Sequence, residues 1–194
     1  MLMKNSFTLL LLLLPFLLYS QKATNTPDLE AATWQKGYTG FVSYGKLIGS
    51  ESDEEPYVNS FHIEQNYRFN KYFAVGLITG TDWFDVTLLP VGADIKLIHQ
   101  LKKTAFYAGG AAGHSFPLEN MGLESINVLD TKGGPFVNAH VGYMISTGRK
   151  INFYVAVGYR YQSFSFIRED LWLTEVERKI TYNRFSARIG VNLF

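Results

Sequence analysis

Apolar and polar residues alternate with a period of two along most of this chain. Residues 151–162 are the clearest case, because every second position from Ile151 to Tyr161 is a large apolar residue and the positions between are polar or small. The same alternation covers residues 61–69, 89–97 and 184–193. Alternation of this length is typical of β-strands with one apolar face, so these four segments are predicted to be strands.

Four further segments have the composition of strands but a less regular alternation. They are residues 38–48, 72–80, 104–114 and 135–146. In the last of them, Val137, Val141 and Ile145 mark an apolar face. The pattern assigns no inner or outer face to residues 38–48 or to the Gly- and Ala-rich residues 104–114.

The connections between these eight segments alternate between short and long. The short ones are residues 70–71, 99–103 and 147–150, and the long ones are residues 49–60, 81–88, 115–134 and 163–179. Short turns on one side and long loops on the other are typical of outer-membrane barrels. Each segment has about the 9–11 residues that a tilted strand needs to cross a bilayer. The sequence therefore predicts an all-β fold, an eight-stranded antiparallel transmembrane up-and-down β-barrel.

The polar faces of these segments combine glycine with charged side chains. The glycines are Gly76, Gly92, Gly142, Gly158 and Gly190, and the charged residues are Glu64, Arg68, Asp94, Lys96, Arg160, Arg184 and Arg188. Long charged side chains fit a narrow lumen where glycines make room, whereas glycine only weakens a strand on a solvent face. We expect the polar faces to line the lumen and the apolar faces to meet lipid. A soluble, lipocalin-like periplasmic carrier with its apolar face inside is an alternative.

The first residues have the layout of a secretory signal peptide. Lys4 precedes an apolar run over residues 7–18, and a small residue, Ser20, precedes a polar stretch. The run is shorter than the roughly 20 residues of a membrane-spanning helix. The expected organisation is a cleaved signal peptide in residues 1–20, a flexible lead-in in residues 21–36 and an outer-membrane barrel in residues 37–194.

Composition excludes several kinds of site. The chain has no cysteine, which excludes disulfides, thiolate metal sites and a lipoprotein anchor. Without Lys4, basic and acidic side chains balance, so no basic field attracts nucleic acid. No phosphate-binding glycine loop and no metal-ligand spacing occurs, and we expect no cofactor and no metal.

Three stretches carry a resemblance to a known class of proteins. They are residues 106–113, 155–161 and 188–194. On these patterns the chain resembles the small outer-membrane β-barrels of the OmpA/OmpX type, especially those common in Bacteroidetes, over residues 38–194. The resemblance implies a barrel surrounded by outer-membrane lipid and lipopolysaccharide and inserted by the barrel-insertion machinery.

His114 and Ser115, with Glu119 nearby, form the strongest candidate for catalysis. Some eight-stranded outer-membrane barrels modify lipid A with a His, a Ser and an acid, and a serine nucleophile needs a base within hydrogen-bond reach. Adjacent residues of a strand point to opposite faces, which separates His114 from Ser115 if the strand continues. The acidic residues 51–55 lack the glycine and spacing of a calcium loop and are expected to be a solvated loop.

The charged residues expected in the lumen have two possible interpretations. With His62 and His140 they could form an ion pathway, or they could neutralise one another and plug the lumen. Because eight strands leave room for little more than side chains, we favour the plug. We expect Glu64 and Asp94 to face inward and pair with some of the basic residues named above.

Taken together, the sequence predicts a porin-like but non-enzymatic outer-membrane barrel with a structural or partner-docking role. The long loops carry apolar residues such as Phe116 and Trp172, which suit contacts among the loops or with other envelope proteins. A lipid A-modifying enzyme is the second hypothesis and the periplasmic carrier is the third.

Overall fold

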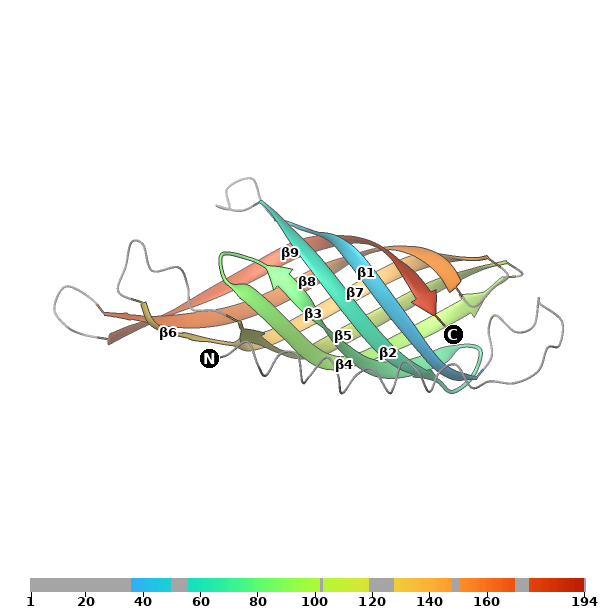
Figure 1. Cartoon of the computed structure of the whole chain (residues 1–194), viewed down its shortest axis with the longest axis horizontal. Helices are drawn as coiled ribbons and strands as arrows, with labels where there is room; N and C mark the ends of the chain where they lie inside the picture. The colour runs from blue at the N-terminus through green and yellow to red at the C-terminus, as the bar shows by residue number, and fades with distance from the viewer. Residues whose placement is uncertain are drawn as a thin grey trace.

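The structure of this chain, a computed structural model, is an elongated barrel of long antiparallel strands (Figure 1). It describes residues 36–49, 56–101, 103–118, 128–147, 151–169 and 175–193. The strands are β1 (Gly37–Ile48), β2 (Tyr57–Arg68), β3 (Phe73–Trp83), β4 (Thr87–Gln100), β5 (Thr104–Pro117), β6 (Val128–Lys132), β7 (Gly134–Ser146), β8 (Ile151–Glu169) and β9 (Glu175–Leu193). Within these ranges, no helix is long and apolar enough to cross a membrane.

Eight of the strands close on themselves. The wall runs β1-β2-β3-β4-β5-β7-β8-β9, every neighbouring pair is antiparallel, and β9 pairs back onto β1. The short β6 stands outside the wall and pairs with the outer part of β8. The predicted eight-stranded antiparallel barrel is confirmed. We call the side of the connections β2–β3, β4–β5 and β7–β8 the short-turn end, and the opposite side the long-loop end.

The pairing register fixes the shape of the barrel. Paired residues lead once around the wall from Gly37 through Arg68, Ala74, Lys96, Gly109, His140, Gly158 and Ser186 to Leu47. The path returns to β1 ten residues beyond its start, from position 37 to position 47. For eight strands this stagger corresponds to a tilt of about 40° and a lumen just wide enough for side chains to fill.

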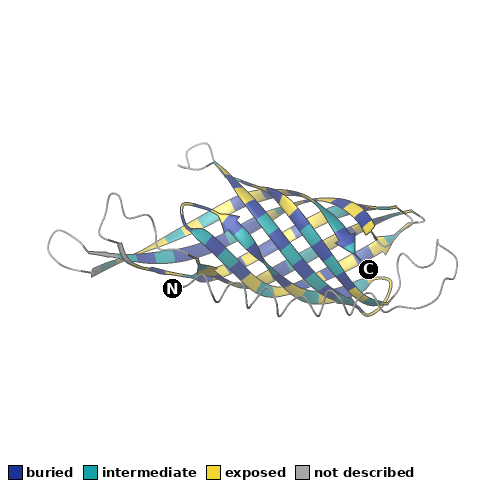
Figure 2. Cartoon of the chain, in the orientation of Figure 1, coloured by how far each residue is buried: buried dark blue, intermediate teal, exposed yellow. Residues whose placement is uncertain are grey.

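Burial alternates over most of each wall strand, as Figure 2 shows. The structure assigns the two faces that the sequence left open. On β1, Phe41 and Leu47 point inward and are buried, and on β5 the inward Tyr107 is 4% exposed. An aromatic residue therefore enters the lumen from each of the two strands whose pattern was ambiguous.

Several strands are longer than predicted on the long-loop side. Residues 81–88 were expected to be a loop, but β3 continues to Trp83, and only Phe84–Val86 separate it from β4. That expectation is wrong because Asp82 and Leu88 still pair across the two strands. The expected loop of residues 163–179 is largely strand as well.

The β8–β9 hairpin projects beyond the barrel wall (Figure 1). Its pairing extends from Ile151↔Leu193 to Glu169↔Glu175, whereas β7 leaves β8 at Gln162 and β1 leaves β9 at Phe185. Strand β6 pairs with the outer part of β8, so β6, β8 and β9 form a small sheet beyond the wall at the long-loop end. The expected signal peptide and lead-in, apart from Lys36, lie outside the described residues.

Glycines on the inner face allow close packing at the wall. A Cβ added to Gly190 would stand 2.3 Å from the main-chain oxygen of Val42 and 2.7 Å from the ring of Tyr154. The first clash is with main chain of the neighbouring strand, which a rotamer change cannot relieve. Gly190 is therefore a position where the pairing of β9 with β1 depends on the lack of a side chain.

We predict that Gly190→Val lowers the free energy of unfolding by about 1–3 kcal/mol through overpacking. Denaturant titration of the protein refolded in detergent micelles measures the change. Ala187→Val on the outward face of β9 is the matched control, with an expected change within about 0.5 kcal/mol. Equal stability of the two variants would contradict the packing described here.

Candidate functional site

Charged side chains fill the middle of the lumen. All seven of the charged residues proposed from the sequence point inward and are at most 4% exposed: Glu64, Arg68, Asp94, Lys96, Arg160, Arg184 and Arg188. His62 and His140 point inward too and are buried. Every one of these positions follows from strand alternation, because residues two apart share a face.

One cluster of charges joins opposite walls through Glu64 on β2. Its Oε2 lies 2.5 Å from Nζ of Lys96 on β4, and its Oε1 lies 3.2 Å from Nη1 of Arg188 on β9. Lys96 also pairs with Asp94, two residues earlier on the same face. Strands β4 and β9 are four steps apart in the eight-stranded ring, so this cluster spans the lumen.

A second cluster spans the lumen through Asp82 on β3. Its Oδ2 lies 2.5 Å from Nη2 of Arg160 on β8, and its Oδ1 lies 3.0 Å from Nε2 of His62 on β2. Arg160 also donates to Oε1 of Gln162 at 3.0 Å, and Ser115 donates to the same oxygen. Strands β3 and β8 are also on opposite sides of the ring.

His62 connects the two clusters. Its Nδ1 lies 3.4 Å from Nη1 of Arg188, while its Nε2 faces Asp82. A neutral imidazole with its hydrogen on Nε2 satisfies both contacts, since it donates to the carboxylate and accepts from the guanidinium. The connected network then holds three carboxylates (Glu64, Asp82, Asp94) and three cations (Lys96, Arg160, Arg188), which balance.

Asp82 is not among the residues expected in the lumen, because the sequence predicts a loop over residues 81–88. The available signal was the alternation of β3 itself, in which Ala74, Ile78 and Asp82 fall on the same face. Without Asp82, the residues expected in the lumen include fewer acidic than basic side chains. With Asp82 placed, Arg160 pairs with that carboxylate rather than with Glu64 or Asp94.

The other two basic residues lie toward the two ends of the lumen. Arg68 donates from Nε and Nη2 to the carbonyl oxygens of Asn70 and Lys71, at 3.2 and 2.9 Å, in the β2–β3 turn. Arg184 lies over the rings of Tyr182 and Phe84, 5.0 and 5.9 Å from their centres. These guanidinium groups are stabilised by carbonyl dipoles and aromatic faces.

An apolar cluster lies on each side of the charged network along the barrel axis. Toward the short-turn end, Phe41, Ile98, Tyr107 and Met144 pack together with Tyr154. Toward the long-loop end the cluster consists of Leu47, Val58, Phe84, Val86, Leu88, Phe164 and Phe166. Phe84 and Val86 come from the β3–β4 loop, which folds into the mouth, where Phe84 stacks on Tyr182 at 4.5 Å.

The catalytic candidate of the sequence is divided between two faces. His114 is exposed on the outer face of β5, and Ser115 is buried and bonded to Gln162. Glu119 and the acidic residues 51–55 lie outside the described residues. Across the part of the chain that the structure describes, no three His, Asp or Glu side chains gather as a metal site.

Comparison with known proteins gives a likeness in fold. No protein-family model and no curated protein matches this chain. Among solved structures, the outer membrane protein OprG from Pseudomonas aeruginosa is similar, with a TM-score of 0.66 at 10% identity over 83% of this chain and 97% of that one.

Two other solved structures share the fold. The outer membrane protein AlkL, solved in DMPC bilayers, matches with a TM-score of 0.52 at 18% identity, over 88% of this chain and 95% of its own. Neisserial surface protein A matches with a TM-score of 0.56 at 12% identity, over 80% of this chain and 95% of its own. At these identities the likeness establishes the barrel fold.

We predict that Asp82→Asn destabilises the barrel by about 3–5 kcal/mol, because it leaves the Arg160 guanidinium buried without its carboxylate. Unfolding by denaturant in detergent micelles measures the loss. Asp85→Asn, an exposed carboxylate three residues away, is the control and should change stability by less than about 0.5 kcal/mol. A change in Asp82→Asn no larger than that of the control would show that the stability of the network does not depend on Asp82.

Proposed function

We propose that this chain is an integral outer-membrane barrel whose role is structural or partner-docking rather than catalytic. The observation that carries the proposal is the apolar outer face of the wall. Large apolar side chains stand exposed on it, among them Leu77 and Phe185 at 67%, Ile189 at 64% and Val157 at 60%. Water would penalise such a surface, whereas hydrocarbon suits it, and a closed barrel leaves no strand edge unpaired in lipid.

Exposed aromatic side chains near both ends of the wall support this environment. Tyr38, Phe69 and Tyr72 lie at the short-turn end, and Tyr57 and Trp83 lie at the long-loop end. Amphipathic rings are enriched at the level of the lipid headgroups. The same arrangement argues against the periplasmic carrier, which would need its apolar face around a ligand inside the barrel.

The filling of the lumen supports a plug rather than an ion pathway. The charged network is neutral within itself, and an apolar cluster lies on each side of it along the barrel axis. An ion crossing the lumen would have to leave water and pass two apolar layers, which is costly. We therefore propose that the barrel is closed to ions.

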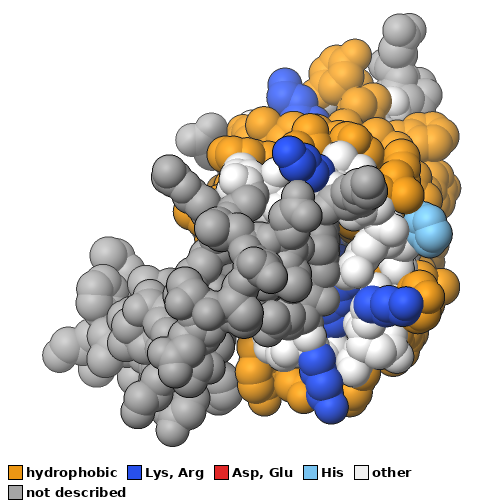
Figure 3. Space-filling model, turned by 90° about the vertical axis from the view of Figure 1, so that its right-hand side faces the viewer, with side chains coloured by type: hydrophobic (Ala, Val, Ile, Leu, Met, Phe, Trp, Pro, Cys, Tyr) orange, Lys and Arg blue, Asp and Glu red, His pale blue; other side chains and the backbone are white. Residues whose placement is uncertain are grey.

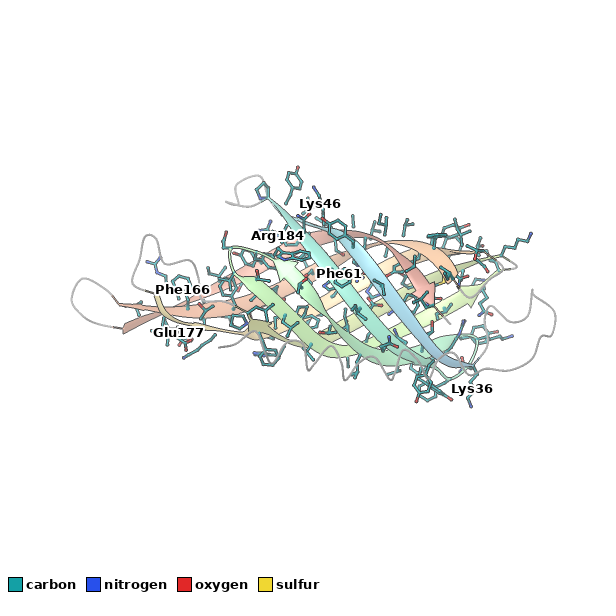
Figure 4. The ribbon with its side chains drawn as sticks, viewed as in Figure 1. Lys36, Lys46, Phe61, Phe166, Glu177 and Arg184 are labelled. Carbon is teal, nitrogen blue, oxygen red and sulfur yellow. The ribbon has the colours of Figure 1, made fainter. Side chains whose placement is uncertain are left out.

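The projecting hairpin supports the docking part of the role. Figure 4 shows Phe166 and Glu177 on β8 and β9 far from Lys36 at the opposite end. Strand β6 pairs with the β8 edge of this hairpin. We propose that other envelope proteins dock at this end, and that residues 1–20 direct export before the barrel-insertion machinery places the barrel among lipid and lipopolysaccharide.

Membership of the OmpA/OmpX type remains part of the proposal, supported by the closed eight-stranded wall. A lipid A-modifying activity is disfavoured by the outward His114 and the inward Ser115, which point away from each other. Comparing lipid A mass spectra from cells with and without the protein separates these hypotheses.

The location has a direct test. Because its outer face is apolar, the protein should stay with the outer-membrane fraction, require detergent for extraction and shift in gel mobility on heating. Cell fractionation followed by electrophoresis of heated and unheated samples measures this. Release into the aqueous fraction by osmotic shock would contradict the proposal.

The closed lumen has a test of its own. Purified protein in a planar bilayer should give no steady conductance, since the apolar clusters and paired charges fill the lumen. An empty bilayer treated with the same detergent is the control. A stable open pore would contradict the plug and favour the ion pathway.

A further inference from the structure

An apolar groove of about 720 Å³ crosses the outer face of the barrel near the short-turn end. The side of the groove farther from the short-turn end follows the paired residues Leu97, Ala108, Val141 and Val157. The side nearer that end includes His99 and Phe106. Ala108 and the main chain at Gly142 lie between larger side chains, which makes the wall concave there. The volume is in the range of sites that hold a small-molecule ligand.

The groove runs diagonally, from the rim of the barrel toward its middle. Counted from the short-turn end of its own strand, Leu97 is three residues in, Ala108 four, Val141 five and Val157 six. The tilt of the strands produces this slope, because a row of paired residues lies perpendicular to tilted strands. One end of the groove therefore reaches the rim and the other end lies deep on the apolar wall.

The rim end of the groove is basic. Tyr72 lines the groove there, and Nζ of Lys71 lies 4.9 Å from the centre of its ring. His99, on the same side, is exposed on the outer face. Lys103 precedes the strand that contributes Phe106 and Ala108.

The exposed charges of the whole short-turn end are positive as well. Among the described residues of that end, the exposed charged side chains are Lys36, Lys71 and Lys103, all basic. Figure 3, which views this end, shows Lys and Arg side chains and a histidine among apolar ones. The long-loop end is mixed, with Asp85 and Glu177 exposed there beside basic residues.

We propose that this groove binds one anionic glycerophospholipid of the leaflet on the short-turn side. An acyl chain lies along the apolar floor from Leu97 to Val157, and the phosphate lies at the rim beside Lys71 and His99. This inference rests on the proposed membrane location. A basic rim joined to an apolar floor complements an anionic headgroup joined to an acyl chain, and a lysine near a membrane surface attracts anionic lipid.

The test uses the full chain purified in detergent and native mass spectrometry. Phosphatidylglycerol and phosphatidylcholine with identical acyl chains are added in turn, and the fraction of protein that carries one lipid is measured. We expect one retained phosphatidylglycerol and much weaker retention of phosphatidylcholine. Equal retention of both lipids would overturn the proposal, as would a lipid-free dimer, which would assign the groove to a second copy of the chain.

Two pairs of variants separate the floor from the rim. Ala108→Phe fills the groove from the outer face and should weaken lipid retention by about tenfold, since it displaces at least two methylene groups from contact. Ala187→Phe, an exposed alanine on β9 outside the groove, should retain lipid like the wild type. Ala108→Leu replaces the first variant if that one does not fold.

Lys71→Gln removes a positive charge beside the phosphate, so it should weaken the retention of phosphatidylglycerol by about fivefold and reduce the preference for phosphatidylglycerol over phosphatidylcholine. Lys46→Gln removes the same charge at the long-loop end, where Figure 4 labels Lys46, and should have no effect. Wild-type retention in both Ala108→Phe and Lys71→Gln would overturn the site.

The heat-dependent gel shift of each sample keeps this test apart from that of the proposed function. A heat-shifting, detergent-requiring barrel without lipid selectivity would overturn the lipid site alone. A protein released by osmotic shock would overturn both.

Discussion

The pairing of β9 with β1 is the constraint on which the rest of this structure depends. It turns an open sheet into a closed wall, so that every wall strand has two neighbours and the backbone groups of the wall are paired. Closure with an advance of ten residues also fixes the tilt and the width of the lumen. Once that width is fixed, the inward side chains must fill the space and neutralise one another, because too little room remains for bulk water.

The lumenal network satisfies this requirement by joining opposite walls. Glu64 links β4 to β9 and Asp82 links β3 to β8, and His62 lies between the two clusters. Breaking such a pair leaves a buried charge, which costs far more than an exposed salt bridge contributes. An arrangement of the walls that separated these partners would leave buried charges unpaired, so the network disfavours it. Small residues such as Gly158 and Gly190 allow the longer side chains to pack against neighbouring main chain.

The two ends of the barrel differ in form and in charge. At the long-loop end, β8 and β9 extend past the wall, β6 joins them, and Phe84 and Val86 of the β3–β4 loop pack into the mouth. At the short-turn end the strands stop near the rim, which carries exposed lysines and the open end of the outer groove. Docking of proteins is proposed at the first end and recognition of lipid at the second.

The sequence by itself determined the strands and, where alternation was regular, their inner and outer faces. Alternation is a local property with a period of two, so Glu64, Asp94 and Arg188 could be placed on the inner face before any pairing was known. What the tertiary structure decided is non-local: where pairing stops, which strands face each other across the lumen, and what fills its ends. Asp82 shows the difference, because it follows Gly80 and Thr81 in a stretch that has the composition of a turn, and only pairing of β3 with β4 extends the strand to include it. The partners of each charge depend on the stagger of the whole ring, which no single segment of the sequence encodes.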